Sequence, residues 1–368
     1  MIVLEVEGIQ YAAFTKANVQ LRLDALSNTF SFDATAANAS PLPFKGGQAC
    51  KVYADGELIL TGHIELLSVS YDSGQHTISF QGRDRTSDLL DSSLAGLTLK
   101  APITLATLCR RVIKHLGSDL TVVDDANAKP FKQAEDIASP DPGENAFTFL
   151  EKYSRKRQVL LSSTPEGNLW LTQSSGVNTG GSVIHRIGNP GNANNVIRSD
   201  MTYDTTGRFN LYRSVSQLNT SAGALAGILA AASVADQGTK NTATDDEVRK
   251  GRQLILVSEA SLSGKDTLDR ATWEANIRKA RGKVYSADVS GFRDQEGNLW
   301  KLNTLPQVID EFADIEARML VNTISFSNSL SDGNAGVTLG FVESNAYKLT
   351  LLEPVEEKLG KGVFALPS

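Results

Sequence analysis

Residues that build metal sites and disulfides are scarce in this chain of 368 residues, which has two cysteines and four histidines. Cys50 and Cys109 lie far apart and neither belongs to a CxxC motif, so we expect two reduced, buried thiols. The histidines form no HExxH pair, and none neighbours a cysteine: they are His63, His76, His115 and His185. The sequence therefore predicts no bound metal and no other cofactor.

Motifs of common enzyme classes are also missing. The chain has no GxSxG, no P-loop and no GxGxxG. Acidic residues cluster at 245–247 and 310–316, but a glycosidase needs two carboxylates held in one cleft, and nothing in these segments marks such a pair. We interpret both clusters as solvated faces. The sequence predicts no catalytic residue and no enzyme.

A basic excess and long apolar runs are absent as well. The net charge of −6 argues against a dedicated nucleic-acid or membrane surface. The one basic run, Lys152–Arg157, is typical of the polar end of a helix. No window approaches the roughly 18 apolar residues of a membrane span. Because Glu5 and Glu7 interrupt the apolar N-terminus, we expect a strand there, not a signal peptide, and synthesis in the cytoplasm.

What the chain does have is a repeated pattern of β-hairpins. Residues His63–Thr86 and Arg318–Tyr347 each show two alternating apolar stretches around a turn that contains Gly and Asp. A further hairpin is expected just before each, at 52–60 and 292–300. Two hairpins in the same order, occurring twice, indicate a duplicated β-domain with a large insertion between the copies.

The rest of the chain alternates between β and α patterns. A helix is predicted from Leu105 to Leu116, with Thr104 as N-cap and Gly117 just beyond its end. Further helices are expected at 146–157 and 266–281. Strands are expected at 2–6, 17–23, 29–33, 159–162, 169–172, 195–203, 209–217 and 254–257. Residues 219–248, rich in Ala, Thr and Asp, predict a mobile loop.

These patterns predict an α+β, mainly β protein with two similar β-barrels and an α+β insert between and within them. The expected division has four parts: a first barrel at 1–96; an insert at 97–175 with 218–282; a second barrel at 176–217 with 283–350; and a C-terminal tail at 351–368. The charged segment Gly82–Thr86, at the end of the first barrel, is expected to form an ion-pair cluster at a domain junction.

Four segments carry a resemblance to a known family, in this order: GRDRTSDLLDSS (82–93), ATWEANIRKARG (271–282), VSGFRDQEGNLWKLN (289–303) and RMLVNTISF (318–326). They resemble the baseplate central hub, or 43 kDa tail protein, of Mu-like contractile-tailed phages. P2-type late control D proteins and the hub portion of type VI secretion spikes are similar in plan. Phe292 departs from the pattern, which has Trp at that place.

The resemblance implies a homotrimer in which two similar barrels per chain build a ring of near-sixfold character. Such a ring would adapt a sixfold tail tube to a threefold central spike, contact neighbouring baseplate proteins, and let DNA pass without sequence-specific binding. A lumen lined by polar and acidic side chains is expected. Two alternatives stay open: a tail-associated cell-wall hydrolase, and a carbohydrate-binding β-protein, for which the aromatic content of 7% offers little.

Overall fold

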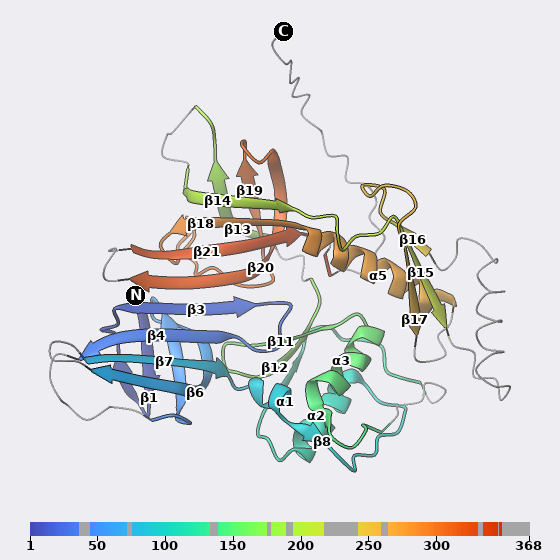
Figure 1. Ribbon diagram of the computed structural model, residues 1–368, viewed down its shortest axis with the longest axis horizontal. Coiled ribbons are helices and arrows are strands. Elements are labelled where there is room, and N and C mark those ends of the chain that lie inside the picture. Colours follow the sequence, from blue (N-terminus) through green and yellow to red (C-terminus); the bar gives the residue numbers. More distant parts are fainter. Residues whose placement is uncertain are drawn as a thin grey trace, which may run out of the picture.

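A single large β-sheet runs through most of the molecule in the computed structural model (Figure 1). The structure describes residues 1–36, 45–71, 76–132, 139–174, 178–188, 194–216, 242–258, 264–329, 334–344 and 346–347. Among these residues, the sheet has 13 strands, and three smaller sheets and four helices lie beside it. Within the described ranges, no helix combines the length and the hydropathy that crossing a membrane requires.

The first half of the large sheet is built from the N-terminal strands. These are β1 (Ile2–Val6), β2 (Ile9–Tyr11), β3 (Lys16–Arg22), β4 (Thr29–Ala36), β5 (Ala49–Ala54), β6 (Glu57–Tyr71) and β7 (His76–Asp84). The second half is built from strands on both sides of an insertion. These are β13 (Asn178–His185), β14 (Val196–Tyr203), β18 (Lys283–Ser290), β19 (Leu305–Asp310), β20 (Ile315–Ser329) and β21 (Asn334–Glu343).

The two halves share one strand order. The first half reads β3-β4-β7-β6-β5-β1, and the second reads β14-β18-β21-β20-β19-β13. With the short β2 left out and the strands numbered along the chain within each half, both orders are second, third, sixth, fifth, fourth, first. The hairpins at 63–86 and 318–347 therefore occupy equivalent places, β6–β7 and β20–β21. One pairing differs in direction, because β13 runs parallel to β19 whereas β1 runs antiparallel to β5.

Strand β3 joins the halves by pairing with β4 on one side and with β20 on the other. The two ladders make the sheet continuous from β14 to β6, as Figure 1 shows. One apolar cluster spans the joint, and it includes Val19 and Phe32 from the first half with Tyr285, Phe326 and Phe341 from the second. The predicted mainly β character is confirmed.

Short-range sequence signals determine the tight turns of this sheet. Asp55 and Gly56 connect β5 to β6 with φ values of 44° and 82°. Two successive positive φ values are what a two-residue hairpin turn of the favoured hand requires, and Asp-Gly adopts them at little cost. The hairpin predicted at 52–60 is confirmed.

The hairpin predicted at 292–300 forms only as a short antiparallel turn, without extended strands. Residues 292–300 form a loop with one isolated bridge, between Arg293 and Leu299, and the strand that precedes β20 is β19. The Asp294 carboxylate accepts from the backbone N–H groups of Glu296 and Asn298 and holds the turn. Phe292 and Trp300 are both buried, and their apolar side chains anchor the loop on the core. The alternating apolar residues that suggested strands here belong to a loop packed on the core.

A compact α+β unit follows the first half. Its elements are α1 (Ser87–Asp91), β8 (Ser93–Leu94), α2 (Leu105–His115), β9 (Val122–Asp124), β10 (Glu144–Asn145), α3 (Ala146–Lys156), β11 (Leu160–Ser163) and β12 (Leu169–Thr172). It has its own apolar cluster, which includes Leu108 and Phe149. The Thr104 hydroxyl caps α2 by accepting from the Thr107 N–H at 3.1 Å, as predicted. Residues 1–96 were expected to be β throughout, but α1 is helical.

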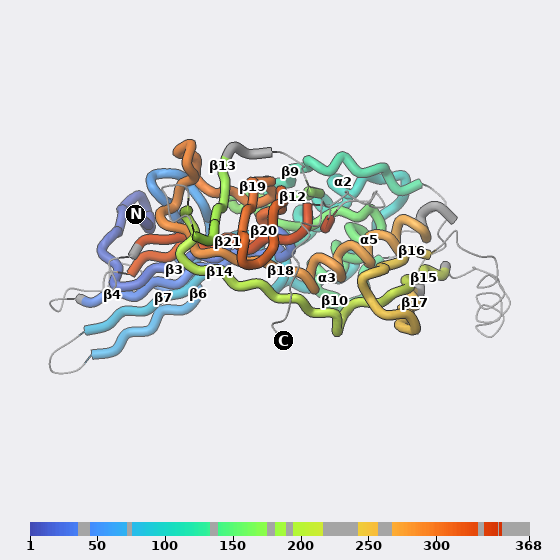
Figure 2. The backbone as a smooth tube through the Cα atoms, turned by 90° about the horizontal axis from the view of Figure 1, so that it is seen from above, coloured from blue at the N-terminus to red at the C-terminus, as the bar shows by residue number. Residues whose placement is uncertain are grey.

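A second unit is inserted between β14 and β18. It contains β15 (Leu211–Ser216), β16 (Thr242–Thr244), β17 (Gln253–Ser258) and α5 (Gly264–Gly282). The strand predicted at 209–217 exists, but it pairs with β16 and β17 and not with the strand before it. Tyr212 and Ala243 pack on Ala271 and Ala275 of α5, so burial against this helix explains the choice. Figure 2 shows α2, α3 and α5 together on one side of the molecule.

Two predicted segments fall wholly or largely outside the described residues. The C-terminal tail at 351–368 is one of them. The loop expected at 219–248 is the other, although its last residues are described and form β16 and the turn after it.

Candidate assembly interface

Strand β14 presents an edge with unused backbone hydrogen-bonding groups. It pairs with β18 on one side, and no described strand pairs with its other side between Arg198 and Tyr203. Three large apolar side chains on β14 are exposed: Ile197 (69%), Met201 (37%) and Tyr203 (54%). An uncovered strand edge with apolar side chains is a template for pairing with another chain.

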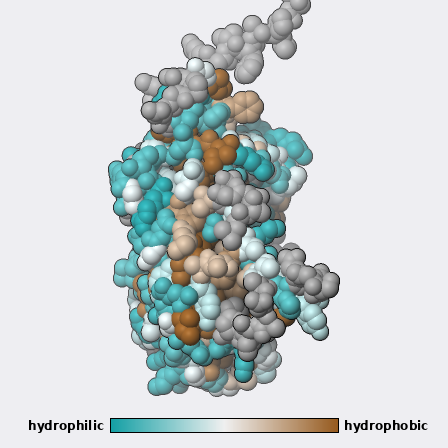
Figure 3. Space-filling view, turned by 90° about the vertical axis from the view of Figure 1, so that its left-hand side faces the viewer, coloured by the Kyte–Doolittle hydropathy of each residue, from teal (hydrophilic) through white to brown (hydrophobic). Residues whose placement is uncertain are grey.

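Strand β6 presents a second edge of this kind. Its first part pairs with β5 up to His63, and its last part pairs only with β7 among the described strands. Leu66, Val69 and Tyr71 are exposed there, Tyr71 by 79%. The two edges lie at opposite margins of the sheet, β14 along the top and β6 along the bottom of Figure 1. Figure 3 shows apolar residues in a broken band on one narrow face.

These edges were not predicted, because alternation in a sequence does not show which strands lack a neighbour. A signal is present all the same. Leu66 and Leu67 are adjacent, as are Val196 and Ile197, so apolar side chains occur on both faces of each strand. A strand with one solvated face does not need that pattern.

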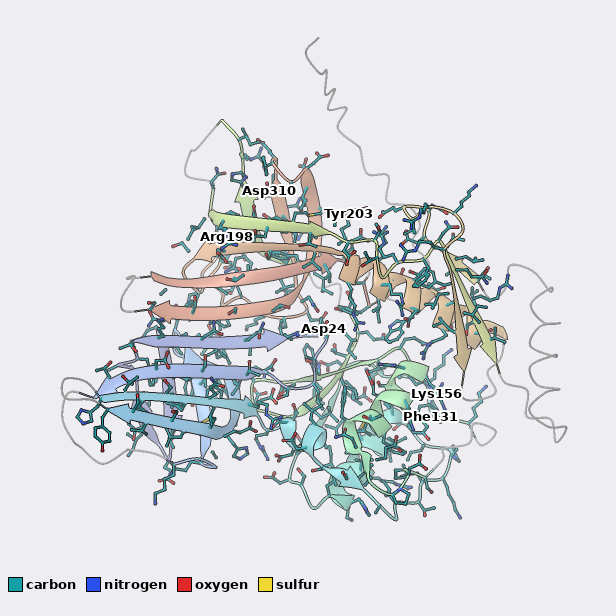
Figure 4. All side chains as sticks on the ribbon, in the orientation of Figure 1. Asp24, Phe131, Lys156, Arg198, Tyr203 and Asp310 are labelled. Atoms are coloured by element: carbon teal, nitrogen blue, oxygen red, sulfur yellow. The ribbon has the colours of Figure 1, made fainter. Side chains whose placement is uncertain are left out.

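The predicted solvated face at 310–316 is wrong for its first residue. Asp310 is fully buried, and its carboxylate accepts from the Tyr285 hydroxyl at 2.7 Å and the Ser199 hydroxyl at 3.0 Å. His185 Nδ1 lies 3.2 Å from the same carboxylate. Burial raises the pKa of Asp310, but hydrogen bonds from Tyr285 and the Ala313 N–H outweigh it and lower the pKa. Figure 4 labels Asp310 at the upper end of the second half.

The solvated face predicted at 245–247 is likewise wrong for its first residue, because Asp245 is buried whereas Asp246 and Glu247 are exposed. Arg208 is fully buried and binds Asp245 through two nitrogens, each 2.9 Å from a carboxylate oxygen. Glu247 contacts Arg208 at 2.7 Å and Lys279 of α5 at 2.8 Å. Burial alone would raise the pKa of Glu247, yet hydrogen bonds from Lys279 and Arg208 lower it to about 2. These contacts fasten the inserted sheet to α5, which is a structural role.

The ion pairs expected at Gly82–Thr86 form with residues outside that segment. Arg83 binds Glu65 of β6 and Asp91 of α1, each at 2.6 Å, and Arg85 binds Asp119 of the α+β unit. Asp84 instead turns inward and accepts from the Asn28 N–H at 2.8 Å and the Thr86 hydroxyl at 2.6 Å. The arginines thus tie the first half to the α+β unit, as a junction cluster would.

The basic run at 152–157 is engaged within the chain. Lys152 binds Glu144 at 2.7 Å, and Arg155 binds Glu151 at 2.6 Å, one turn earlier on α3. Arg157 lies over the Phe131 ring, 4.0 Å from its centre, and donates to the Lys129 carbonyl at 2.8 Å. This supports its interpretation as the polar end of a helix.

No group of three or more potential metal ligands occurs in the part of the chain that the structure describes. Cys50 and Cys109 are both buried, and burial raises the pKa of each thiol to about 12. His115 Nε2 lies 2.8 Å from the Ala95 carbonyl, in a structural contact. Among the described residues, the exposed edges of β14 and β6 are therefore the candidate assembly interface, and the buried charged residues stabilise the fold.

Three family models match separate parts of this chain. Residues 1–84 match "Mu phage baseplate assembly protein GpP-like, N-terminal", 86–173 match "Baseplate hub protein gp44-like, second domain", and 263–349 match "Mu phage baseplate assembly protein GpP, fourth domain". The chain belongs to the Mu-like baseplate hub family. The resemblance carried by the four sequence segments is confirmed.

Individual proteins agree with this membership. The chain is similar to baseplate hub protein gp44 of Escherichia phage Mu, with 24% identity over 336 residues, 90% of this chain and 85% of the relative. It is also similar to the 43 kDa tail protein of prophage MuSo2 from Shewanella oneidensis, with 28% identity, coverage of 94% and 98%, and a TM-score of 0.76.

A third match reaches beyond phages. The E. coli c3393 protein, a component of the type VI secretion system, has 11% identity to this chain, coverage of 92% of this chain and 76% of that protein's chain, and a TM-score of 0.57, which shows a shared fold. The relatives in the family are structural tail and baseplate proteins, so the expectation that this protein is not an enzyme is confirmed.

Proposed function

We propose that this protein is a homotrimeric ring at the centre of a phage baseplate. The ring adapts the sixfold tail tube to the threefold central spike and lets DNA pass without binding a particular sequence. Its partners are the spike protein, the tail tube protein and neighbouring baseplate proteins. It is synthesised in the cytoplasm of the bacterial host and incorporated into the virion tail.

The observation that carries the proposal is the repeated strand order. Two halves with one strand order give each chain two similar units, and three chains then supply six. Each chain also has two sheet edges that no described strand covers, at opposite margins, which favours head-to-tail contacts that close into a ring. The name of a relative adds support, since the similar protein from phage Mu is called a baseplate hub protein.

The proposed division follows the boundaries expected from sequence. The first tube-like barrel is 1–96, the insert is 97–175 with 218–282, and the second barrel is 176–217 with 283–350. We adjust it at β15, residues 211–216, which we group with the insert because this strand pairs with β16 and β17. The proposal includes no catalytic residue, bound metal or cofactor.

Light scattering coupled to size exclusion tests the assembly. We expect a trimer at micromolar concentration and a ring in electron micrographs of the purified protein. A stable monomer would overturn the proposed function. We further propose that polar and acidic side chains line the lumen and repel phosphate. A map of the ring with a lumen dominated by Lys and Arg would refute that part alone.

A further inference from the structure

We propose that residues 199–203 of β14 in one copy of this chain pair antiparallel with residues 67–71 of β6 in the neighbouring copy. The inference rests on the proposed ring and specifies which strands make its subunit contact and in which register. It is drawn from the one place where the chain already makes the equivalent contact, the ladder between β3 and β20.

Equivalent residues in the two halves follow from the ladders themselves. In the first half, a row across four strands runs Val19, Phe30, Gly82, Ile64. In the second half, the equivalent row runs Met201, Tyr285, Phe341, Val321. In β6 and in β20, the register shifts directly after the last residue of the row. Val19 is therefore equivalent to Met201, and Ile64 to Val321.

The internal joint fixes the predicted register. Phe326 of β20 pairs with Val19 of β3. Phe326 lies as far beyond Val321 as Val69 lies beyond Ile64. Transferring the joint to the free edges places Val69 of one copy opposite Met201 of the next. The same register sets Leu67 opposite Tyr203, Ser68 opposite Thr202, Ser70 opposite Asp200 and Tyr71 opposite Ser199.

Side-chain chemistry agrees with this register on both faces. At the internal joint, Val19 and Phe326 are fully buried. At the free edges, the equivalent Val69 and Met201 are exposed by 46% and 37%, and Tyr203 by 54%. Pairing would remove these apolar surfaces from water, which is favourable. The opposite face would hold only Ser68, Ser70, Asp200 and Thr202, which suit a surface in contact with water.

The occupant of each edge is a second copy of this chain because each edge matches the other. The outer edge of β14 is equivalent to the edge of β3 that pairs with β20. The last part of β6 is equivalent to the part of β20 that pairs with β3. The two edges lie at opposite margins of one sheet (Figure 1), so they cannot pair with each other in one chain. Pairing between copies is head-to-tail and continues the sheet from subunit to subunit.

Cysteine cross-linking tests the register. In a Ser68→Cys, Thr202→Cys double variant, the two thiols belong to directly opposed residues of neighbouring copies, within the reach of a disulfide. After mild oxidation we expect covalent species of two and three chains on a non-reducing gel. The native thiols give little background because Cys50 and Cys109 are buried.

Matched variants make the result decisive. Gln20→Cys with Ser325→Cys is the equivalent pair inside one chain and should form an internal disulfide under the same oxidation. Val69→Cys with Thr202→Cys puts the thiols on opposite faces and should not cross-link. If the Ser68, Thr202 variant is a trimer by light scattering but stays uncross-linked while the internal pair oxidises, the strand pairing is overturned and the ring stands. If the unmodified protein is a monomer, both the strand pairing and the proposed function are overturned.

A charge placed at the predicted contact gives a second readout. Met201→Asp would bury a carboxylate opposite Val69, so we expect the trimer to dissociate to folded monomers. Ile197→Asp introduces the same charge on the same strand at a more exposed site, outside the paired residues, and should leave the trimer intact. Equal behaviour of the two variants would contradict the inference.

Discussion

Arg208 shows how a single buried cation organises its surroundings. Its guanidinium is fully buried and bound by Asp245 and Glu247. Removing one partner of a buried pair leaves the other charge without compensation, which costs more than the pair itself contributes. The pair therefore makes the inserted unit sensitive to replacement of either residue.

We expect Arg208→Met to lower the free energy of unfolding by about 3–5 kcal/mol, because it leaves Asp245 buried without its partner. Urea unfolding followed by circular dichroism measures this loss. Arg208→Met with Asp245→Leu should recover part of the stability. Arg155→Ala, which removes an exposed pair on α3, should change it by less than about 0.5 kcal/mol. A loss from Arg208→Met no larger than that control would contradict the assignment.

Glu247 makes stability depend on pH in the acid range. Its pKa is about 2 in the folded chain, against 4.5 ordinarily. Because the folded pKa is the lower one, the stabilisation is complete above about pH 4.5 and is lost as pH falls toward 2. With a partly exposed carboxylate, we expect about 1–2 kcal/mol.

The measurement is the free energy of unfolding of the native chain and of Glu247→Gln at pH 7 and pH 3. The variant should be less stable at pH 7, and the difference should shrink at pH 3. A difference that stays constant between the two pH values would show that the Glu247 carboxylate does not titrate as described.

At the scale of elements, β6 and β7 depend on Gly62, where their backbones come close. A Cβ on Gly62 would overlap the Arg83 carbonyl and lie 2.7 Å from the Asp84 Cα. Both are backbone atoms of a paired strand, so they cannot rotate away. We expect Gly62→Ala to destabilise the first half by about 2–3 kcal/mol, measured by thermal unfolding.

Gly46→Ala is the matched control for that experiment. The nearest atom to a Cβ at this position is the Glu65 carbonyl oxygen at 3.8 Å, an ordinary contact. Its effect should stay within about 0.5 kcal/mol. If Gly62→Ala also leaves the stability unchanged, the ladder between β6 and β7 adjusts to a Cβ more easily than its geometry indicates.

Elements that the sequence predicted well are those set by nearby residues. The Asp55-Gly56 turn, the Thr104 cap and the helix ending before Gly117 need only short-range contacts. The partner of β15 and the pairing of β3 with β20 depend on residues far away in the chain, which alternation does not specify. Arg208 and Asp245 were missed for the same reason, since acidic residues next to one another look solvated until a distant cation is located.

At the scale of the whole molecule, the joint between β3 and β20 makes the two halves one cooperative unit. Val19 and Phe326 lie in a single apolar cluster that extends into both. Damage at the joint should therefore loosen strands in both halves. Two lobes with separate cores would respond separately.

We expect Val19→Ala to cost about 2 kcal/mol and to lower hydrogen-exchange protection in β7 and β21 together. Leu108→Ala, in the separate cluster of the α+β unit, should lower protection mainly in α2 and α3. Loss of protection in β7 alone after Val19→Ala would show that the halves unfold independently.

The position of the insertion between β14 and β18 gives the proposed ring an alternating outline. The equivalent connection in the first half, from β3 to β4, spans only residues 23–28, whereas residues 204–282 connect β14 to β18 and include α5. Around a ring of three chains, successive repeats would then differ at every second position. A partner that contacts only the large sheet would find six nearly identical binding positions around the ring. A partner that also contacts the inserted units would find only three.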